Sequence, residues 1–274
     1  MATVRFTVTR TLALALGLAA SQSPAEVPAE YREAVTRAET LGTAIYVHDS
    51  AGARATDELI DRGLLEKDKR LRGWITALPP NSDSVLVTFV GEDGGTTKAL
   101  YRILVPPNAQ PPHFEALKPA QPLTDTERAL FAARTLAVAQ LNNDKDRCAA
   151  SYNSVVLPIE RAGDPFILVY LLAATNEPGV VVAGGHIRYE VSPDGTHIEG
   201  QRTFTRSCME IPPEPKDKKV AAVMLTHLLD PTPTEIHVFL SREYRRPFFI
   251  GTAENDLVWR VDGSHINLMD QQKK

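Results

Sequence analysis

The spacing of hydrophobic residues in the first half of the chain changes from helical to extended. Four residues recur at helical intervals and predict a helix over residues 28–41: Tyr31, Val35, Ala38 and Leu41. The apolar run 45–47 predicts a short strand, and residues 55–65 predict a second helix. Three strands are then predicted between Pro- and Gly-containing turns: 72–78, 84–90 and 98–105. Short turns favour antiparallel neighbours, so we expect two helices against a small meander.

The second half begins with a helix-start pattern and continues with apolar strands. Thr124 and Glu127 form a capping-box pattern, in which a hydroxyl and a carboxylate satisfy free amides at a helix N-terminus. Small and aliphatic residues repeat behind it at helical spacing: Leu130, Ala133, Ala137 and Leu141. Residues 154–158 and 166–174 are dense enough in apolar residues to predict buried strands.

A β-hairpin is predicted around the turn at residues 193–195, between residues 180–191 and the segment from Thr196 onward. Its first strand alternates apolar with polar residues, the polar ones being His186, Arg188 and Glu190. Because alternate residues of a strand face opposite sides, we expect that polar face to be wet. Residues 220–225 predict a further buried strand.

The segment that follows residue 230 has two interpretations. Its composition is compatible with a strand, whereas its first residues form a helix-start pattern. Thr232 as N-cap, Pro233 at the first helical position and Glu235 at the third favour a helix. Three cations near its end suit the negative end of the helix dipole: Arg242, Arg245 and Arg246. We prefer the helix, which Pro247 would stop. Two strands are predicted after it: 248–252 and 257–261.

These elements predict an α+β fold, in which a small helix-plus-antiparallel-meander unit precedes a larger mixed-sheet unit with flanking helices. Prolines crowd residues 106–123, where they remove backbone donors and fix φ. We therefore expect a linker there. The predicted units are residues 28–105 and residues 124–270, the second carrying one disulfide.

Residues 1–21 have the layout of a secretory signal peptide. Arg5 and Arg10 precede an apolar run, and small residues stand at 19–21, where a signal peptidase would cut. Crossing a bilayer takes about 20 apolar residues, roughly twice the length of this run. We therefore expect the segment to be removed and the mature chain to have no transmembrane segment. This predicts a periplasmic or secreted protein.

The cysteine count and the net charge further restrict the functions that the sequence is compatible with. Cys148 and Cys208 are the two cysteines, and an even count in an exported chain predicts one disulfide. Two separate buried thiols are the alternative. The formal net charge is −4, and a chain without a basic excess is not expected to bind nucleic acid. With 43% hydrophobic residues, the chain can form a substantial core.

Five of the seven histidines lie after residue 180: His186, His197, His227, His237 and His265. No two of them have the short spacing that places two imidazoles on one side of a helix or strand, so we expect no metal and no cofactor. Four residues near one another in the sequence are candidates for acid/base chemistry: His48, Asp49, Asp57 and Asp61. The alternative is that they cap a helix or face the solvent. The sequence contains no Gly-x-Ser-x-Gly pattern of a nucleophilic serine.

The polar positions of greatest interest lie between the predicted strand 220–225 and the helix after it: His227, Asp230, Thr232 and Glu235. Junctions of this kind in α/β-type cores often expose ligand-binding loops. The alternative is that Asp230 and Thr232 only build the turn and cap the helix.

The order of elements over residues 124–268 resembles the JAMM/MPN fold, whose members include zinc isopeptidases. In that family the buried strand ends in His-x-His, and Ser-x-x-Asp at the next helix completes the site with a Glu from an earlier strand. Leu225 and His227 stand at the first pair of positions, Thr232 and Glu235 at the second, and strand 154–158 has no Glu. The resemblance therefore implies a fold with a degenerate metal site.

We therefore expect an exported, non-catalytic binding or envelope-associated protein whose partner is an unidentified protein or small molecule. The alternative is a metal-dependent, isopeptidase-like hydrolase that uses the loop from His227 to Glu235. A small-molecule carrier is a third class, and it would need an apolar pocket.

Overall fold

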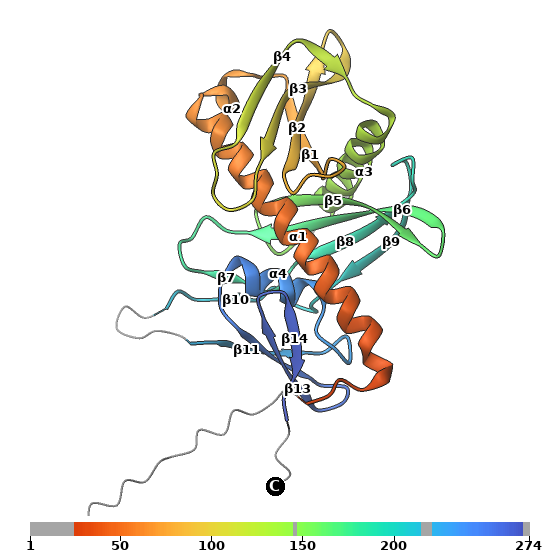
Figure 1. The fold of residues 1–274 in the computed structure, drawn as a ribbon, viewed down its shortest axis with the longest axis vertical. Helices are drawn as coiled ribbons and strands as arrows, with labels where there is room; N and C mark the ends of the chain where they lie inside the picture. The colour runs from red at the N-terminus through yellow and green to blue at the C-terminus, as the bar shows by residue number, and fades with distance from the viewer. Residues whose placement is uncertain (1–24, 145–146, 215–220, 271–274) are drawn as a thin grey trace, which may run out of the picture.

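The computed structural model describes residues 25–144, 147–214 and 221–270, so the signal peptide predicted for residues 1–21 lies outside the described residues. Figure 1 shows three layers of strands along the longest axis, with one long helix running across them. Helices and mainly antiparallel sheets are combined, which confirms the α+β class. Within the described ranges, no helix has the length and apolarity to cross a membrane.

The first element is one helix, α1 (Ala29–Asp61), where the sequence predicted a helix, a strand and a second helix. The predicted strand at 45–47 is wrong because the helical spacing of buried side chains continues through it. Ile45 and Leu59 are both fully buried, and burying such a side chain contributes roughly 1.5–3 kcal/mol. That gain exceeds the few tenths of a kcal/mol by which β-branched residues disfavour a helix. A one-turn helix follows, α2 (Leu64–Lys67).

An antiparallel sheet in the order β1-β2-β3-β4 forms the upper layer. The three predicted strands are confirmed: β1 (Leu71–Ala77), β2 (Val85–Asp93) and β3 (Thr96–Val105). The linker predicted for residues 106–123 is wrong over most of its length, because β4 (His113–Pro122) pairs with β3 there. β4 is an edge strand, and an edge tolerates prolines whose missing amides would break the ladder of an inner strand.

Helix α3 (Asp125–Asn142) begins at the predicted capping box. The Glu127 amide donates to Thr124 Oγ1 at 3.2 Å, and the Thr124 amide donates to Glu127 Oε2 at 2.9 Å. The helix covers one face of a middle antiparallel sheet, whose strands in spatial order are β5 (Ser151–Arg161), β6 (Asp164–Ala174), β8 (Ile187–Val191) and β9 (Ile198–Thr203).

Strand β6 is buried on both faces, which explains its unbroken apolar run. Leu168 and Tyr170 face α1 and α4 (Glu235–Glu243), whereas Val169 and Leu171 face α3. The hairpin between β8 and β9 is confirmed, but the expectation that its polar face is wet is wrong. Arg188 on that face is buried, because α4 packs over it.

The lower layer is a mixed sheet in the order β11-β12-β13-β14, next to a two-stranded ribbon of β7 (Val181–Val182) and β10 (Glu210–Ile211). β11 and β12 are parallel, and α4 connects them. The predicted strands 248–252 and 257–261 are confirmed, the strand predicted for 220–225 begins only at Val223, with residue 220 outside the described residues, and β14 was not predicted. The bounds of the elements are β11 (Val223–His227), α4 (Glu235–Glu243), β12 (Phe248–Thr252), β13 (Leu257–Asp262) and β14 (His265–Leu268).

The preferred helical interpretation of the segment after residue 230 is confirmed by α4, but the helix begins two residues later than predicted. Its N-cap is Thr234 and not Thr232. The reason is His237, whose Nδ1 accepts the Thr234 amide at 2.9 Å and so completes the first turn in place of the predicted glutamate. Thr232 and Pro233 lie in the loop before the cap.

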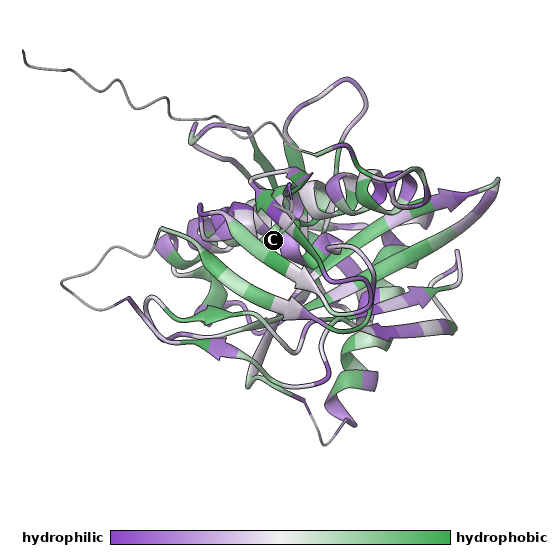
Figure 2. Ribbon diagram, turned by 90° about the horizontal axis from the view of Figure 1, so that it is seen from below, coloured by the Kyte–Doolittle hydropathy of each residue, from purple (hydrophilic) through white to green (hydrophobic). Residues whose placement is uncertain are grey.

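Three hydrophobic clusters form the core, and α1 contributes to two of them. Its first half, with Leu41 and Ile45, packs against the middle sheet, α4 and the lower sheet. Its second half, with Ala55 and Leu59, packs against β2 and β3. In Figure 2 the central strands are largely hydrophobic, whereas the hydrophilic segments lie mostly towards the periphery. One helix therefore joins the upper and lower layers.

Helices α1 and α4 cross closely at Gly42. A Cβ at this position would lie 2.5 Å from the carbonyl oxygen of Glu235 and 2.5 Å from the Cβ of Val238. Only glycine allows the two backbones to approach this far. The crossing brings the first turns of α1 beside the loop that leads into α4.

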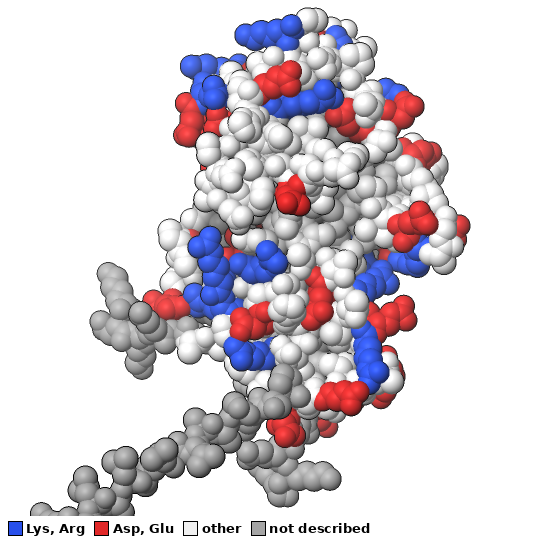
Figure 3. Space-filling model, in the orientation of Figure 1, with Lys and Arg blue, Asp and Glu red and all other residues white. Residues whose placement is uncertain are grey.

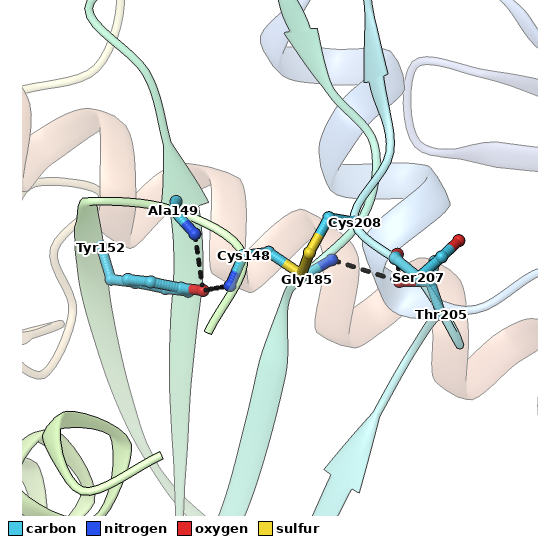
Figure 4. Close-up of a disulfide and its surroundings, with 7 residues drawn as sticks. All are labelled: Cys148, Ala149, Tyr152, Gly185, Thr205, Ser207 and Cys208. Carbon is cyan, nitrogen blue, oxygen red and sulfur yellow. Dashed lines mark hydrogen bonds between the residues drawn. A yellow bond between two sulfur atoms is a disulfide. The ribbon is translucent and has the colours of Figure 1, made fainter. Parts of the chain in front are cut away.

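The predicted disulfide between Cys148 and Cys208 is confirmed (Figure 4). It joins the segment before β5 to the segment between β9 and β10. The hydroxyl of Tyr152 accepts the Cys148 amide at 2.9 Å, which positions the first cysteine. Gly185 lies against the bond with φ of +81°, and a Cβ there would overlap that of Cys148.

Replacing both cysteines by alanine removes a cross-link between residues 60 apart in the sequence. The entropy of the unfolded chain rises, and we expect the free energy of unfolding to fall by about 4 kcal/mol. Urea denaturation of the double variant and of the oxidised protein measures this difference. The reduced protein should resemble the variant, and equal midpoints for all three samples would contradict a stabilising bond.

Candidate functional site

The loop between β11 and α4 lies against the first turns of α1, and a pocket of about 310 Å³ separates them. Three of the four predicted candidates line this pocket: Asp230, Thr232 and Glu235. The fourth, His227, is buried behind Asp230. The other charged residues of the lining come from distant parts of the chain: Glu30, Glu33, Arg37, Arg188 and Arg202.

His227 and Arg202 both hold Asp230. His227 Nε2 lies 2.7 Å from Asp230 Oδ2, and Arg202 Nη2 donates to both carboxylate oxygens at 2.8 and 2.7 Å. Burial acts to raise the pKa of Asp230, but the hydrogen bond from His227 and the charge of Arg202 outweigh it and lower the pKa. An ionised carboxylate only accepts hydrogen bonds, so His227 carries its proton on Nε2.

Glu235 forms a buried ion pair with Arg188 at the base of the pocket. Arg188 Nη1 donates to Glu235 Oε1 at 2.7 Å, and the two side chains are 9% and 7% exposed. The Tyr170 hydroxyl donates to the same oxygen at 3.1 Å, and burial together with the charge of Glu235 raises the pKa of Tyr170. Arg188 Nη2 also donates to Glu190 at 3.0 Å. A buried pair of this kind is costly to break, because either partner alone is a buried charge.

His237 is a second imidazole beside this network, and it is neutral. Its Nδ1 accepts the Thr234 amide, and burial and the neighbouring His227 lower its pKa to about 3. The His227 and His237 rings meet edge to face, with centroids 4.8 Å apart. Both rings are therefore held by protein contacts.

The α1 side of the pocket differs from its base because its charges are exposed. Glu30, Glu33 and Arg37 lie on the first turns of the helix, and none of them forms an ion pair with another described residue. In Figure 3, acidic and basic side chains alternate over the part of the surface that the first half of α1 crosses. The rim therefore offers both signs of charge to a ligand.

The sequence identified the loop but missed its partners. The alternation of residues in the hairpin predicts a solvent-exposed face for Arg188, and no sequence motif connects Arg202 or Tyr170 with the loop. The remaining histidines do not join the site. His186, for example, is buried elsewhere, where it accepts the Ala173 amide on Nδ1 at 3.2 Å and contacts the Val182 carbonyl through Nε2 at 3.0 Å.

The acid/base group considered around residue 48 does not assemble. His48 faces β1, where its Nδ1 lies 2.7 Å from Thr76 Oγ1. Asp49 instead interacts with Glu243 of α4 and Asn153 of β5, and Asp57 and Asp61 are exposed on α1. Among the described residues, no three His, Cys, Asp or Glu side chains gather in a way that could hold a metal ion.

Comparison with known proteins finds no matching family model, no matching curated protein and no matching solved structure. The resemblance of residues 124–268 to the JAMM/MPN fold therefore stays a prediction.

Replacing Glu235 by glutamine is expected to lower the free energy of unfolding by about 3 kcal/mol, because Arg188 loses its main counter-charge in the interior. The Arg188→Met/Glu235→Gln double variant removes both charges and should lose less than the sum of the losses of the Arg188→Met and Glu235→Gln single variants. A matched control is Glu26→Gln, which breaks an exposed pair with Arg32 and should cost less than about 1 kcal/mol. If the double variant loses as much free energy of unfolding as the two single variants together, Arg188 and Glu235 do not stabilise each other and the prediction is contradicted.

Stability is also expected to fall as the pH is lowered from about 6.5 to 4. Burial lowers the pKa of three histidines from 6.5 to about 4, 4 and 3: His48, His186 and His237. The unfolded chain takes up these protons first, so stability present above pH 6.5 is lost as the pH falls towards 4.

Asp49 has the opposite effect, because burial and the charge of Glu243 raise its pKa to about 7 and its contribution to stability is lost as the pH rises towards 7. Denaturation of His48→Asn between pH 7 and 4.5 should therefore give a shallower decline, and that of Asp49→Asn a steeper one. Identical slopes for both variants and the original protein would contradict this assignment.

Proposed function

We propose that this protein is an exported, non-catalytic binding protein that takes a small zwitterionic ligand in the pocket between α1 and the β11–α4 loop. The observation that carries the proposal is the division of charge in this pocket. The charges at its base are paired within the protein, whereas both signs remain unpaired on the rim at Glu30, Glu33 and Arg37.

The state of the loop residues supports binding without catalysis. A general base needs a lone pair within reach of the proton it abstracts. Asp230 accepts from Arg202 at both oxygens and contacts His227, and its lowered pKa makes it a weak base, whereas Glu235 is held through Oε1 by the Arg188 guanidinium and the Tyr170 hydroxyl. A metal ion at Asp230 would meet the guanidinium of Arg202 at the same oxygens, which disfavours the hydrolase alternative.

The size and charge of the pocket indicate the class of ligand. A volume of about 310 Å³ lies at the lower end of the roughly 300–1,000 Å³ typical of small-molecule sites. A free amino acid or a short peptide has a carboxylate for Arg37 and an ammonium group for Glu30 or Glu33. Ion pairs of this kind favour ligands that carry both charges over ligands that carry one.

Export is proposed on two features that point the same way. Residues 1–21 have the layout of a secretory leader. The bond between Cys148 and Cys208 is of a kind that persists in oxidising compartments such as the periplasm or the extracellular space.

Calorimetric titration with free amino acids and dipeptides tests the proposal. Arg37→Ala and Glu33→Ala should each weaken binding about tenfold, equivalent to about 1.4 kcal/mol. Arg32→Ala is the matched control on the same helix, because Arg32 pairs with Glu26 and does not line the pocket. Binding that is indifferent to Arg37 and Glu33 would overturn the site. Stoichiometric zinc that is lost in His227→Ala would favour the hydrolase instead.

A further inference from the structure

A second cavity, separate from the charged pocket, runs along α3 as an apolar groove of about 1460 Å³. Phe131 and Val138 line it from one flank of the helix, seven residues apart, and both remain partly exposed. The β5–β6 hairpin contributes Pro158, Ile159 and Pro165. A concave, mainly apolar lining with a few polar groups is typical of small-molecule binding sites.

Arg134 lies on the same flank of α3, three residues after Phe131, and also lines the groove. Its Nε donates to Ser154 Oγ at 2.9 Å, and its guanidinium lies 5.4 Å from the centre of the Trp74 ring. Gly73 leaves room for it, because a Cβ there would come within 2.5 Å of Arg134 Nη1. The guanidinium is therefore held in a fixed place.

Arg134 has no counter-charge among the described residues. It forms no ion pair, and burial lowers its pKa. Two other arginines that are removed from solvent have carboxylate partners, Arg102 with Glu127 and Arg188 with Glu235. Removing a cation from water without a partner costs free energy. An anionic ligand would supply the missing partner.

The lining of the groove carries three arginines and three carboxylates, so its formal net charge is zero and its arginines differ in whether a carboxylate pairs with them. Its carboxylates are already engaged: Asp125 pairs with Arg128, Asp194 accepts from Ser192 and Thr196, and Glu92 accepts from Thr97. Arg72, the strand neighbour of Gly73, donates only to backbone carbonyls. Two guanidinium groups therefore remain available to a ligand.

We propose that the groove along α3 binds a single-chain carboxylate with a long apolar tail, the carboxylate pairing with Arg134 and the tail lying on Phe131, Val138 and the β5–β6 hairpin. A guanidinium matches a carboxylate through two parallel hydrogen bonds. The apolar walls exclude water from that pair and strengthen it. This activity is independent of the zwitterion pocket, which lies against α1 and α4.

The experiment titrates the oxidised protein with dodecanoate below its micelle concentration and follows Trp74 fluorescence and heat. Saturable binding is expected, with a dissociation constant that Arg134→Gln raises at least tenfold. Arg260→Gln is the control, since Arg260 forms an exposed pair with Asp262 and does not line the groove. Dodecyltrimethylammonium has the same tail with the opposite charge and should bind at least tenfold more weakly than dodecanoate.

A second variant guards against misfolding of Arg134→Gln. Val138→Asp keeps Arg134 but places a carboxylate one helical turn from it, where it supplies the counter-charge itself, and should also abolish dodecanoate binding while the melting temperature stays within a few degrees of the original. Equal affinity for the anionic and cationic amphiphiles, or retention of dodecanoate binding by both variants, would overturn the proposal. Absence of saturable dodecanoate binding to the original protein would overturn it as well.

Discussion

The packing of α1 against every layer of the molecule is the constraint on which the rest of the fold depends. The helix covers the middle and lower sheets with its first half and β2 and β3 with its second half. Gly42 sets how closely it approaches α4. Because the same helix completes two hydrophobic clusters, neither the upper nor the lower layer has a full core without it.

The charged pocket is a product of this arrangement. Packing of α1 and α4 over the middle sheet buries the strand face that carries Arg188, and burying this guanidinium without a counter-charge would be costly. Glu235 supplies that charge from the first turn of α4, and Tyr170 completes the pair from the most buried strand. The pocket therefore has a buried base, which the pair of Arg188 and Glu235 forms, and a solvent-exposed rim.

Local sequence patterns predict most of the helices and strands correctly. The features that they miss depend on contacts between segments that lie far apart in the chain. The Thr124 capping box and the hairpin at 193–195 depend on neighbouring residues, so both were predicted. β4 was missed because its prolines disfavour strands everywhere except at an edge. Burial of Arg188 depends on α4, which lies almost fifty residues away in the chain. The loop of His227 and Asp230 was located, but Arg202, which binds it, was not.

The length of α1 also determines how far a tilt at one end of the helix displaces the other end. Nineteen residues separate Gly42 from the end of the helix, which corresponds to about 28 Å at a rise of 1.5 Å per residue. A tilt of about 5° around the crossing point would displace the far end by roughly 2.5 Å beneath β2 and β3. A ligand that shifted the first turns of the helix would therefore also shift the residues at its other end, which pack against β2 and β3.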